Sequence, residues 1–358
     1  MSERLRVVIT GGGGFVGTHV ALSFRHRYPS ADIVAFDNLQ RRGSELNLSQ
    51  LREHGIAFVH GDVRQPSDLE QLDGDFDVMI EASAEPSVHA GMDGSPRRVL
   101  DINLGGTINC LEFCRQRVRD LVFLSTSRVY AIGALRGLAL REGATRFELD
   151  AAQPFEGASA LGIGERFPTD GPRSFYGASK LASEMLIQEY AASTSLRAVI
   201  NRCGVIAGPG QFGKVDQGVF TLWVANHHFN RRLRYTGFGG TGKQVRDLLH
   251  PEDLCDLLHL QLTRMADCSG QTYNVGGGLA VSTSLLELTA VCREVTGRRI
   301  DIEPVAETAN VDIPLYITDA RKAQDTLGWT PTRNVATIVG DIHRWIAGNE
   351  RALQAVLG

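Results

Sequence analysis

The chain has 358 residues, 37 of them basic and 41 acidic, which gives a formal net charge of −4. A chain of this length can bury one large hydrophobic core or two modest ones. The nearly balanced charge creates no field that would attract nucleic acid or an anionic membrane surface. The apolar runs are too short to cross a bilayer, and no cleavable apolar leader precedes the first predicted strand. We therefore expect a cytoplasmic protein without nucleic-acid or membrane partners.

The six cysteines are scattered, with no Cys-x-x-Cys pair and no histidine cluster at ligand spacing. This pattern argues against a zinc site and against a disulfide framework, so we predict reduced core thiols and no metal. His227 and His228 are adjacent and would point in different directions on a helix, which indicates a solvated pair rather than metal ligands.

The first predicted element is an apolar strand over residues 7–10, followed by glycines at positions 11, 14 and 17 and by apolar residues at helical spacing. Glycine adopts the backbone angles of a tight turn at low cost, and the N–H groups at a helix N-terminus bind phosphate. This order predicts a dinucleotide-binding turn, although a structural turn can also be rich in glycine. The predicted cofactor-binding residues here are Gly11, Gly14, Phe15, Val16 and Gly17.

A second predicted strand, 33–36, ends in Asp37, twenty residues after the last glycine of the turn. That separation is expected for a carboxylate that binds the adenosine ribose hydroxyls, and it favours the dinucleotide interpretation. Asn38 follows as a further cofactor-binding candidate. Arg41 and Arg42 could hold the 2′-phosphate of NADP, but Asp37 would repel that phosphate, so we predict NAD.

The third predicted strand, 56–59, is followed by Asp62 and Val63, which we also assign to the cofactor site. The Asp62 carboxylate would accept a hydrogen bond from the adenine amino group, or alternatively cap the turn before Pro66.

The fourth predicted strand, 77–80, leads into Ala82 and Ser83, small residues that let the backbone pass close to the far ribose of the cofactor. Glu81 lies at the end of this buried strand. It either forms a pair inside the following loop, which we favour, or touches a sugar or ribose. Asn103 either braces the backbone near the active site or caps the next helix.

The fifth predicted strand, 121–124, ends in hydroxyl residues that include Thr126, at the carboxyl edge where parallel sheets bind ligands. Residues 131–173 form a long, loop-like insertion without a clean period. Loops of this length are usually functional or disordered, and we expect this one to cover the substrate.

Tyr176 and Lys180 are four residues apart in the next predicted helix, so they share one face. A tyrosine acts as a base near neutral pH only if its pKa of about 10 is lowered by roughly three units. A lysine ammonium about 4 Å away supplies about that much at an effective dielectric of about 20. We predict that Thr126, Tyr176 and Lys180 oxidise a secondary alcohol with NAD, and that Tyr176 and Lys180 also contact the cofactor. The alternative is an exposed helix start with a chance tyrosine and lysine.

These motifs together, Thr-Gly-x-x-Gly-x-x-Gly from Thr10, the strand-end hydroxyls and Tyr176-x-x-x-Lys180, resemble the extended short-chain dehydrogenase/reductase superfamily, in its nucleotide-sugar epimerase and dehydratase branch. The stretches 245–250 and 274–277 match the substrate lobe of that branch, so the resemblance covers nearly the whole chain. It implies bound NAD, a nucleotide-diphosphate sugar substrate, and a homodimer or homotetramer.

Four further stretches are most similar to the CDP-tyvelose (CDP-paratose) 2-epimerases: 36–43, 59–64, 215–218 and 242–247. This similarity implies transient oxidation of a sugar carbinol to a ketone and return of the hydride to the other face. Where the family usually has histidine at the end of the fourth strand, this chain has Glu81.

The two residues after Thr126 distinguish reaction types within the branch. The 4,6-dehydratases carry an acidic pair there, and related decarboxylases carry a glutamate, whereas this chain has Ser127 and Arg128. An epimerase needs no such acid, so we predict an epimerase. A dehydratase or decarboxylase is the alternative, followed by a non-catalytic NAD-binding regulator.

The candidate substrate-binding residues are Arg128, Asn201, Gln217 and Arg246. Arg128 binds either a sugar hydroxyl or a carboxylate of the long loop. Arg246 is the candidate for the diphosphate, and an exposed ion pair with Asp247 or Asp253 is its alternative.

Strands and helices alternate through the first half, which predicts an α/β fold with a doubly wound parallel sheet of the Rossmann type and a smaller mixed α/β lobe. We place the NAD-binding domain at residues 1–207, with a returning segment 245–275. The substrate-binding lobe is assigned to 208–244 and 276–358.

Overall fold

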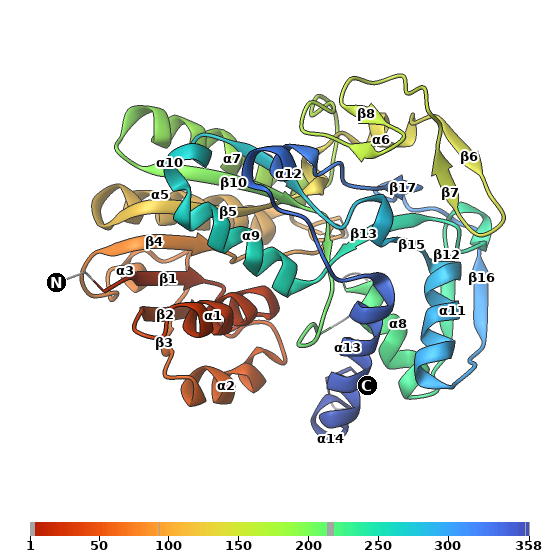
Figure 1. Ribbon diagram of the computed structural model, residues 1–358, viewed down its shortest axis with the longest axis horizontal. Coiled ribbons are helices and arrows are strands. Elements are labelled where there is room, and N and C mark those ends of the chain that lie inside the picture. Colours follow the sequence, from red (N-terminus) through yellow and green to blue (C-terminus); the bar gives the residue numbers. More distant parts are fainter. Residues whose placement is uncertain (1–3, 93, 213–217, 355, 358) are drawn as a thin grey trace. The chain divides into compact units, whose positions relative to one another are not determined.

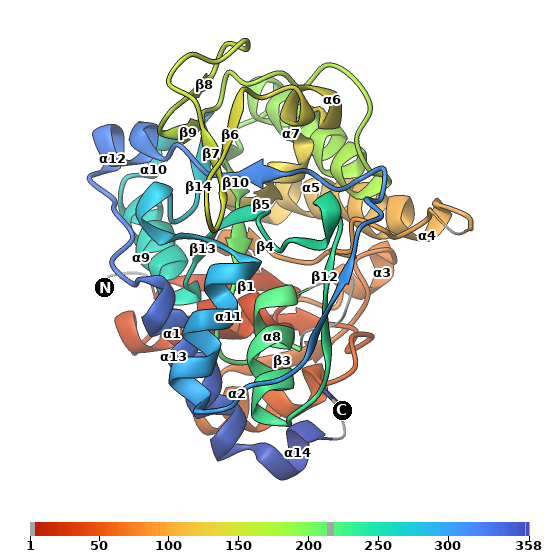
Figure 2. The same cartoon turned by 90° about the vertical axis from the view of Figure 1, so that its right-hand side faces the viewer.

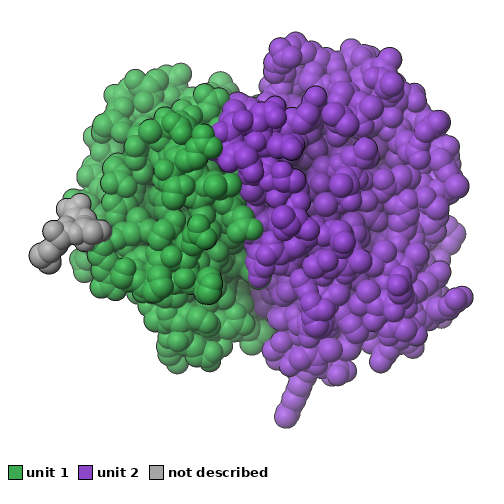
Figure 3. Space-filling model, in the orientation of Figure 1, with its two compact units in different colours: residues 1–129, 175–202, 254–273 green, residues 130–174, 203–253, 274–358 purple. Residues whose placement is uncertain are grey.

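The computed structural model describes residues 4–92, 94–212, 218–354 and 356–357. The chain forms two compact units, coloured separately in Figure 3. Unit 1 contains residues 1–129, 175–202 and 254–273, and unit 2 contains residues 130–174, 203–253 and 274–358. Within the part of the chain that is described, no helix is both long and apolar enough to span a membrane.

A seven-stranded sheet forms the centre of unit 1, with strand order β14-β10-β5-β4-β1-β2-β3 (Figure 1). The pairs along β5-β4-β1-β2-β3 are parallel. Their residues are mostly apolar because helices cover both faces of such a sheet. This topology confirms the predicted doubly wound fold. The strands are β1 (Arg6–Thr10), β2 (Asp32–Asp37), β3 (Ala57–His60), β4 (Phe76–Glu81), β5 (Val118–Thr126), β10 (Arg197–Cys203) and β14 (Thr272–Val275).

Helices lie on both sides of this sheet (Figure 2). On one side are α1 (Phe15–Arg27) and α9 (Pro251–Thr263), where the His259 ring packs 4.5 Å from the Phe24 ring. On the other side, α5 (Gly106–Arg117) and α7 (Phe175–Ser193) bury Leu111 and Ile187 in a core with Phe123 of β5. The short helices of this unit are α2 (Leu48–Glu53), α3 (Pro66–Leu69), α4 (Arg97–Leu100) and α10 (Met265–Cys268).

Unit 2 has its own sheet and its own core. Strand β13 (Val245–Leu249) pairs with three short strands, β11 (Val205–Ile206), β15 (Ser282–Ser284) and β17 (Leu315–Tyr316). A separate pair is formed by β12 (Leu233–Thr236) and β16 (Ile302–Val305). Helices α8 (Val219–His228), α11 (Leu285–Thr296) and α13 (Val335–Gly348) enclose one hydrophobic cluster. Two shorter helices of this unit are α12 (Arg321–Leu327) and α14 (Glu350–Gln354).

His227 and His228 do not form the predicted solvated pair. The His227 side chain is fully buried on α8, and its Nδ1 lies 2.8 Å from the Trp223 carbonyl oxygen. The His228 ring contacts the rings of Phe229 and His343. The prediction was wrong because α11 and α13 both pack on α8, which leaves this short helix little surface for water.

The insertion 131–173 is more ordered than its sequence indicates. It contains α6 (Ile132–Arg136) and two short antiparallel pairs, β6 (Leu140–Glu142) with β7 (Phe147–Leu149) and β8 (Ala158–Ser159) with β9 (Gly162–Ile163). This segment belongs to unit 2, whereas the domain prediction placed it with the NAD-binding residues. Strands of two or three residues are too short to show a sequence period.

Candidate active site

The glycine turn joins β1 to α1. A β-carbon at Gly17 would lie 2.1 Å from the Gly11 carbonyl oxygen, and one at Gly11 would lie 2.8 Å from the Ala82 backbone. At Gly14 the nearest atom would be 3.2 Å away, and no other atom would lie within 4 Å. Gly11 and Gly17 are therefore required for packing of the turn itself, while a β-carbon at Gly14 would have one close contact, with the Gly11 carbonyl oxygen.

This turn has the features of a dinucleotide site. Gly14 is the N-cap of α1 and makes no side-chain cap, so the first N–H groups of the helix, from Phe15, Val16 and Gly17, are not bonded by a cap side chain. Such groups bind phosphate, and the missing side chain at Gly14 would let a pyrophosphate approach them. The residues present therefore fit NAD.

The two predicted carboxylates at the ends of β2 and β3 are both held in place. Asp37 accepts hydrogen bonds from the Gly13 N–H at 3.1 Å and the Leu39 N–H at 2.7 Å. Burial nevertheless raises the pKa of its carboxyl. Asp62 binds Arg64, which lowers the Asp62 pKa to about 2, and it also accepts from Asn38 Nδ2 at 2.9 Å. Asp37, Asn38 and Asp62 thus lie at the ends of β2 and β3, and their contact with adenosine stays a prediction. The Arg64 N–H donates to Asp62 Oδ1 at 2.9 Å, which is the turn cap given as the alternative for Asp62.

The backbone after β4 passes directly over the glycine turn. The Ala82 N–H donates to the Thr10 carbonyl, and Ser83 Oγ lies 3.1 Å from Thr10 Oγ1. Val63, the last of the predicted cofactor contacts, is buried and would lie 2.7 Å from a β-carbon at Gly106.

The predicted catalytic residues lie on β5 and α7 of the same unit. Tyr176 and Lys180 are in the first turns of α7, and Lys180 is only 2% exposed. Its Nζ lies 3.8 Å from the centroid of the Phe123 ring, a favourable position for a cation. The burial of Lys180 argues against the alternative interpretation, in which the tyrosine and lysine lie by chance at an exposed helix start. Thr126 ends β5, and its Oγ1 accepts the Arg128 N–H at 3.2 Å, which leaves the hydroxyl proton to be donated.

A buried carboxylate that sequence reasoning missed joins these two elements. Glu184 lies one turn after Lys180 on α7 and is 1% exposed. It accepts a hydrogen bond from Ser125 Oγ at 2.5 Å and binds Arg202 of β10 at 2.7 Å. Because Ser125 precedes Thr126, this contact fixes the end of β5 to the helix that carries Tyr176. The sequence signal that could have identified Glu184 is its spacing, because Tyr176, Lys180 and Glu184 are successively four residues apart and so share one helix face.

Asn103 braces the backbone of this region. Its Oδ1 accepts the Glu85 N–H at 2.8 Å, and its Nδ2 donates to the Glu85 carbonyl at 3.2 Å and to Ser179 Oγ at 3.1 Å. Asn103 lies in a π-helical turn, η2 (Asp101–Gly105), and the N-cap of α5 is Gly105. The bracing alternative is thus confirmed over the capping one.

The candidate substrate residues have different surroundings. Asn201 is fully buried, and its amide exchanges two hydrogen bonds of 2.8 Å with Gln261, which corrects its assignment to the substrate. Arg246 donates to the carbonyl oxygens of Val245 and Ile313, and Arg128 is half-buried after Thr126. Gln217 lies outside the described residues. Asp253, the alternative partner of Arg246, pairs with Arg333 at 2.7 Å.

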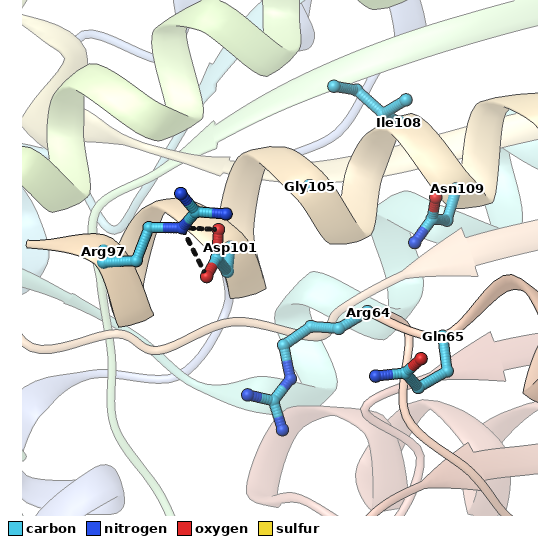
Figure 4. Close-up of a pocket in the computed structure, with 7 residues that line it drawn as sticks. All are labelled: Arg64, Gln65, Arg97, Asp101, Gly105, Ile108 and Asn109. Atoms are coloured by element: carbon cyan, nitrogen blue, oxygen red, sulfur yellow. Dashed lines mark hydrogen bonds and ion pairs between the residues drawn. The ribbon is translucent and has the colours of Figure 1, made fainter.

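A surface pocket of about 390 Å³ lies on unit 1, beside α4 and α5 (Figure 4). None of the predicted site residues lines it. Its two arginines are already paired, Arg64 with Asp62 and Arg97 with Asp101. Elsewhere, all six cysteines are buried thiols outside any disulfide, and no metal-binding group of His, Cys, Asp and Glu occurs among the residues described.

The chain matches the model of the NAD-dependent epimerase/dehydratase family over residues 7–276. It belongs to this family. Membership makes NAD its cofactor, in agreement with the open glycine turn and with Asp37. The NAD-dependent epimerase/dehydratase family spans two reaction types, and the matched range contains both the predicted cofactor residues and the predicted catalytic residues.

Relatives of this family member include both kinds of enzyme. CDP-paratose 2-epimerase of Salmonella typhi is 30% identical over 95% of this chain and 99% of the relative. A dTDP-glucose 4,6-dehydratase of Streptomyces antibioticus is 26% identical over 96% of this chain and 93% of the relative. A dTDP-glucose 4,6-dehydratase double mutant from Streptomyces venezuelae, solved with NAD, is 25% identical, with a TM-score of 0.79 over 98% of this chain and 100% of that one.

Proposed function

We propose that this enzyme inverts one carbon of a nucleotide-activated hexose through transient oxidation to a ketone, as in CDP-paratose/CDP-tyvelose 2-epimerisation. The observation that carries the proposal is the joining of β5 to α7 through Ser125 and Glu184, which holds Thr126 and the Tyr176 to Lys180 face in one unit with the glycine turn. The similarity to CDP-paratose 2-epimerase supports the substrate class.

In this proposal, NAD held by the glycine turn and Asp37 would supply a hydride acceptor for the sugar carbinol and a hydride donor for the ketone. Tyr176 takes the hydroxyl proton as a phenolate and gives it back when the ketone is reduced. Lys180, through its positive charge, stabilises that phenolate, and Thr126 donates a hydrogen bond to the reacting oxygen. The proton and the hydride both return, so the reaction needs no further acid or base.

Ser127 and Arg128 favour this reaction over the alternative lyase. Neither side chain is an acid that could protonate a leaving hydroxyl at the positions after Thr126. We propose Arg128 and Arg246 as substrate contacts, because guanidinium groups suit sugar hydroxyls and a diphosphate. The homodimer or homotetramer and the cytoplasmic location stay predictions, and light scattering after gel filtration tests the first.

The reaction is tested by supplying CDP-hexoses, UDP-glucose and dTDP-glucose to the NAD-loaded protein in heavy water and following them by NMR. We expect inversion at one carbon without change of mass and without solvent deuterium at that carbon. Loss of water or carbon dioxide would establish a lyase. Binding of NAD without any turnover would indicate a regulator.

Replacement of the proposed base gives a sharper test. Tyr176→Phe removes the phenol oxygen that takes the proton, so turnover should fall by at least about a hundredfold. The affinity for NAD should stay within about threefold, because the glycine turn and Asp37 remain. Isothermal titration measures the affinity, and the NMR assay measures turnover. Retained turnover would mean that another group is the base.

A further inference from the structure

Glu81 is a buried carboxyl group that the proposed reaction does not use. It ends β4, is 1% exposed, and lies in register between Thr10 of β1 and Phe123 of β5. Phe123 is also the residue over whose ring Lys180 Nζ is placed. The end of β4 therefore brings a carboxyl group into the surroundings of the proposed catalytic ammonium.

The hydrogen bonds around Thr107 indicate the protonation state of Glu81. Thr107 Oγ1 lies 2.5 Å from Glu81 Oε1 and 2.8 Å from the Asn103 carbonyl oxygen, within hydrogen-bond distance of both. A hydroxyl has one proton to donate, and a carbonyl oxygen can only accept. If Thr107 donates to Asn103, the proton between Thr107 and Glu81 belongs to Glu81. This arrangement fits a neutral carboxylic acid.

The rest of the Glu81 environment also disfavours a charge. Its Oε2 is buried and has no hydrogen-bond partner among the described residues, whereas an ionised carboxylate needs several donors. Burial raises the pKa of Glu81, and the Lys180 charge opposes that rise. The other ionisable groups that face it are the thiols of Cys110 and Cys114 on α5, whose pKa values burial raises well above the ordinary range. Its neighbours on β1 and β5, Thr10 and Phe123, do not ionise.

We propose that Glu81 is kept as a neutral carboxylic acid in the surroundings of Lys180, so that the positive charge of Lys180 is left uncompensated for Tyr176. An ionised Glu81 would offset part of the ammonium charge and weaken its effect on the phenol. This inference rests on the proposed roles of Tyr176 and Lys180. The neutral state of Glu81 can be measured without any turnover.

Infrared spectroscopy of the NAD-loaded protein tests the neutral state. At neutral pH the wild type should show the C=O stretch of a protonated carboxyl group, and Glu81→Gln should lose it. Glu70→Gln, which removes an exposed carboxylate, should keep the band. Thr107→Val provides a second variant, in which the band should move to higher frequency because the O–H loses its acceptor. A wild type without the band would overturn the proposal.

The coupling to Lys180 is tested by titrating the same band. In Lys180→Met the band should persist to a pH at least about one unit higher than in the wild type, because the cation that favours ionisation of Glu81 is gone. Lys180→Arg keeps the charge and should titrate like the wild type. If the charge of Lys180 did not act on Glu81, the band would titrate at the same pH in Lys180→Met and in the wild type. That result would overturn the proposal.

The pH profile of kcat completes the test. If Glu81 is neutral while Tyr176 titrates, Glu81→Gln should leave the midpoint of the acidic limb of this profile within about 0.3 pH unit of the wild type. The value of kcat itself should stay within about threefold. If Glu81 were ionised, its removal would lower the Tyr176 pKa and move the acidic limb down, which would contradict the proposal.

Discussion

Two glycines of the same turn are expected to respond differently to one added methyl group. Gly14 has φ −76° and ψ 175°, angles that alanine adopts freely, and a β-carbon there would lie 3.2 Å from the Gly11 carbonyl oxygen, whereas a β-carbon at Gly17 would lie only 2.1 Å from the same atom. Gly14 is therefore the position at which the effect of cofactor binding can be separated from that of folding.

We expect Gly14→Ala to lower the free energy of unfolding by about 1 kcal/mol, because its close contact at 3.2 Å needs only a small shift, and to weaken NAD binding by at least about tenfold. The methyl group would occupy the space that the pyrophosphate needs. Gly17→Ala should lose more stability, because its β-carbon would overlap the Gly11 carbonyl at 2.1 Å. Urea unfolding and isothermal titration on both variants measure this, and unchanged NAD affinity in Gly14→Ala would show that the cofactor lies elsewhere.

Asp247 provides a second prediction about a single residue. It is fully buried on β13, accepts the Gly278 N–H at 3.0 Å, and burial raises its pKa to about 6. Because folding raises the pKa of Asp247, its contribution to stability is fully present below the pKa of the unfolded state, near 4, and is lost as the pH rises through 6. The free energy of unfolding of the wild type should therefore fall by about 3 kcal/mol between these two pH values. Asp247→Asn should remove that dependence, and exposed Asp301→Asn should keep it, as measured by urea unfolding at several pH values.

At the scale of elements, the Ser125, Glu184 and Arg202 contacts fix α7 to the sheet. Glu184 and Arg202 are both buried, so removing one partner leaves the other charge without compensation. We expect Glu184→Ala to lower the free energy of unfolding by about 3–5 kcal/mol. Glu189→Ala, at an exposed position of α7, should cost less than about 1 kcal/mol. Equal losses in urea unfolding would show that the buried pair does not hold the helix.

The strands of the central sheet could be predicted because each is an apolar run that ends in a turn residue. The strands predicted at 7–10, 33–36 and 121–124 correspond to β1, β2 and β5. The insertion 131–173 could not be predicted in the same way, because its two- and three-residue strands are fixed by partners and not by any period of their own. The same reason accounts for His227, whose burial depends on helices distant in sequence.

Individual site residues could be proposed from the sequence where spacing carried the signal, and their roles stay predictions. Asp37 follows the glycine turn at the separation that a ribose contact requires, and Tyr176 and Lys180 share one helix face. The link from Glu184 to Ser125 spans 59 residues and exists only in three dimensions. Asn201 was misassigned for a related reason, since Gln261, 60 residues further on, occupies its amide.

At the scale of the whole molecule, the residues proposed to bind NAD lie in unit 1. We expect NAD at a hundred times its Kd to stabilise the protein by about 2.7 kcal/mol. Hydrogen exchange should slow most in peptides from β1, α1 and the end of β2, where the glycine turn and Asp37 lie. Peptides from α8, α11 and α13 serve as the internal comparison. Slowing confined to those three helices would place the cofactor in unit 2.

Each unit is assembled from three separate stretches of the chain, so the polypeptide passes from one to the other five times. No single cut can therefore release either unit as a continuous piece, and recombination cannot exchange one of them as a cassette. Within such a gene, a new preference has to arise by point substitutions and by small insertions. This constraint is consistent with epimerases and dehydratases that align with nearly the whole of this chain.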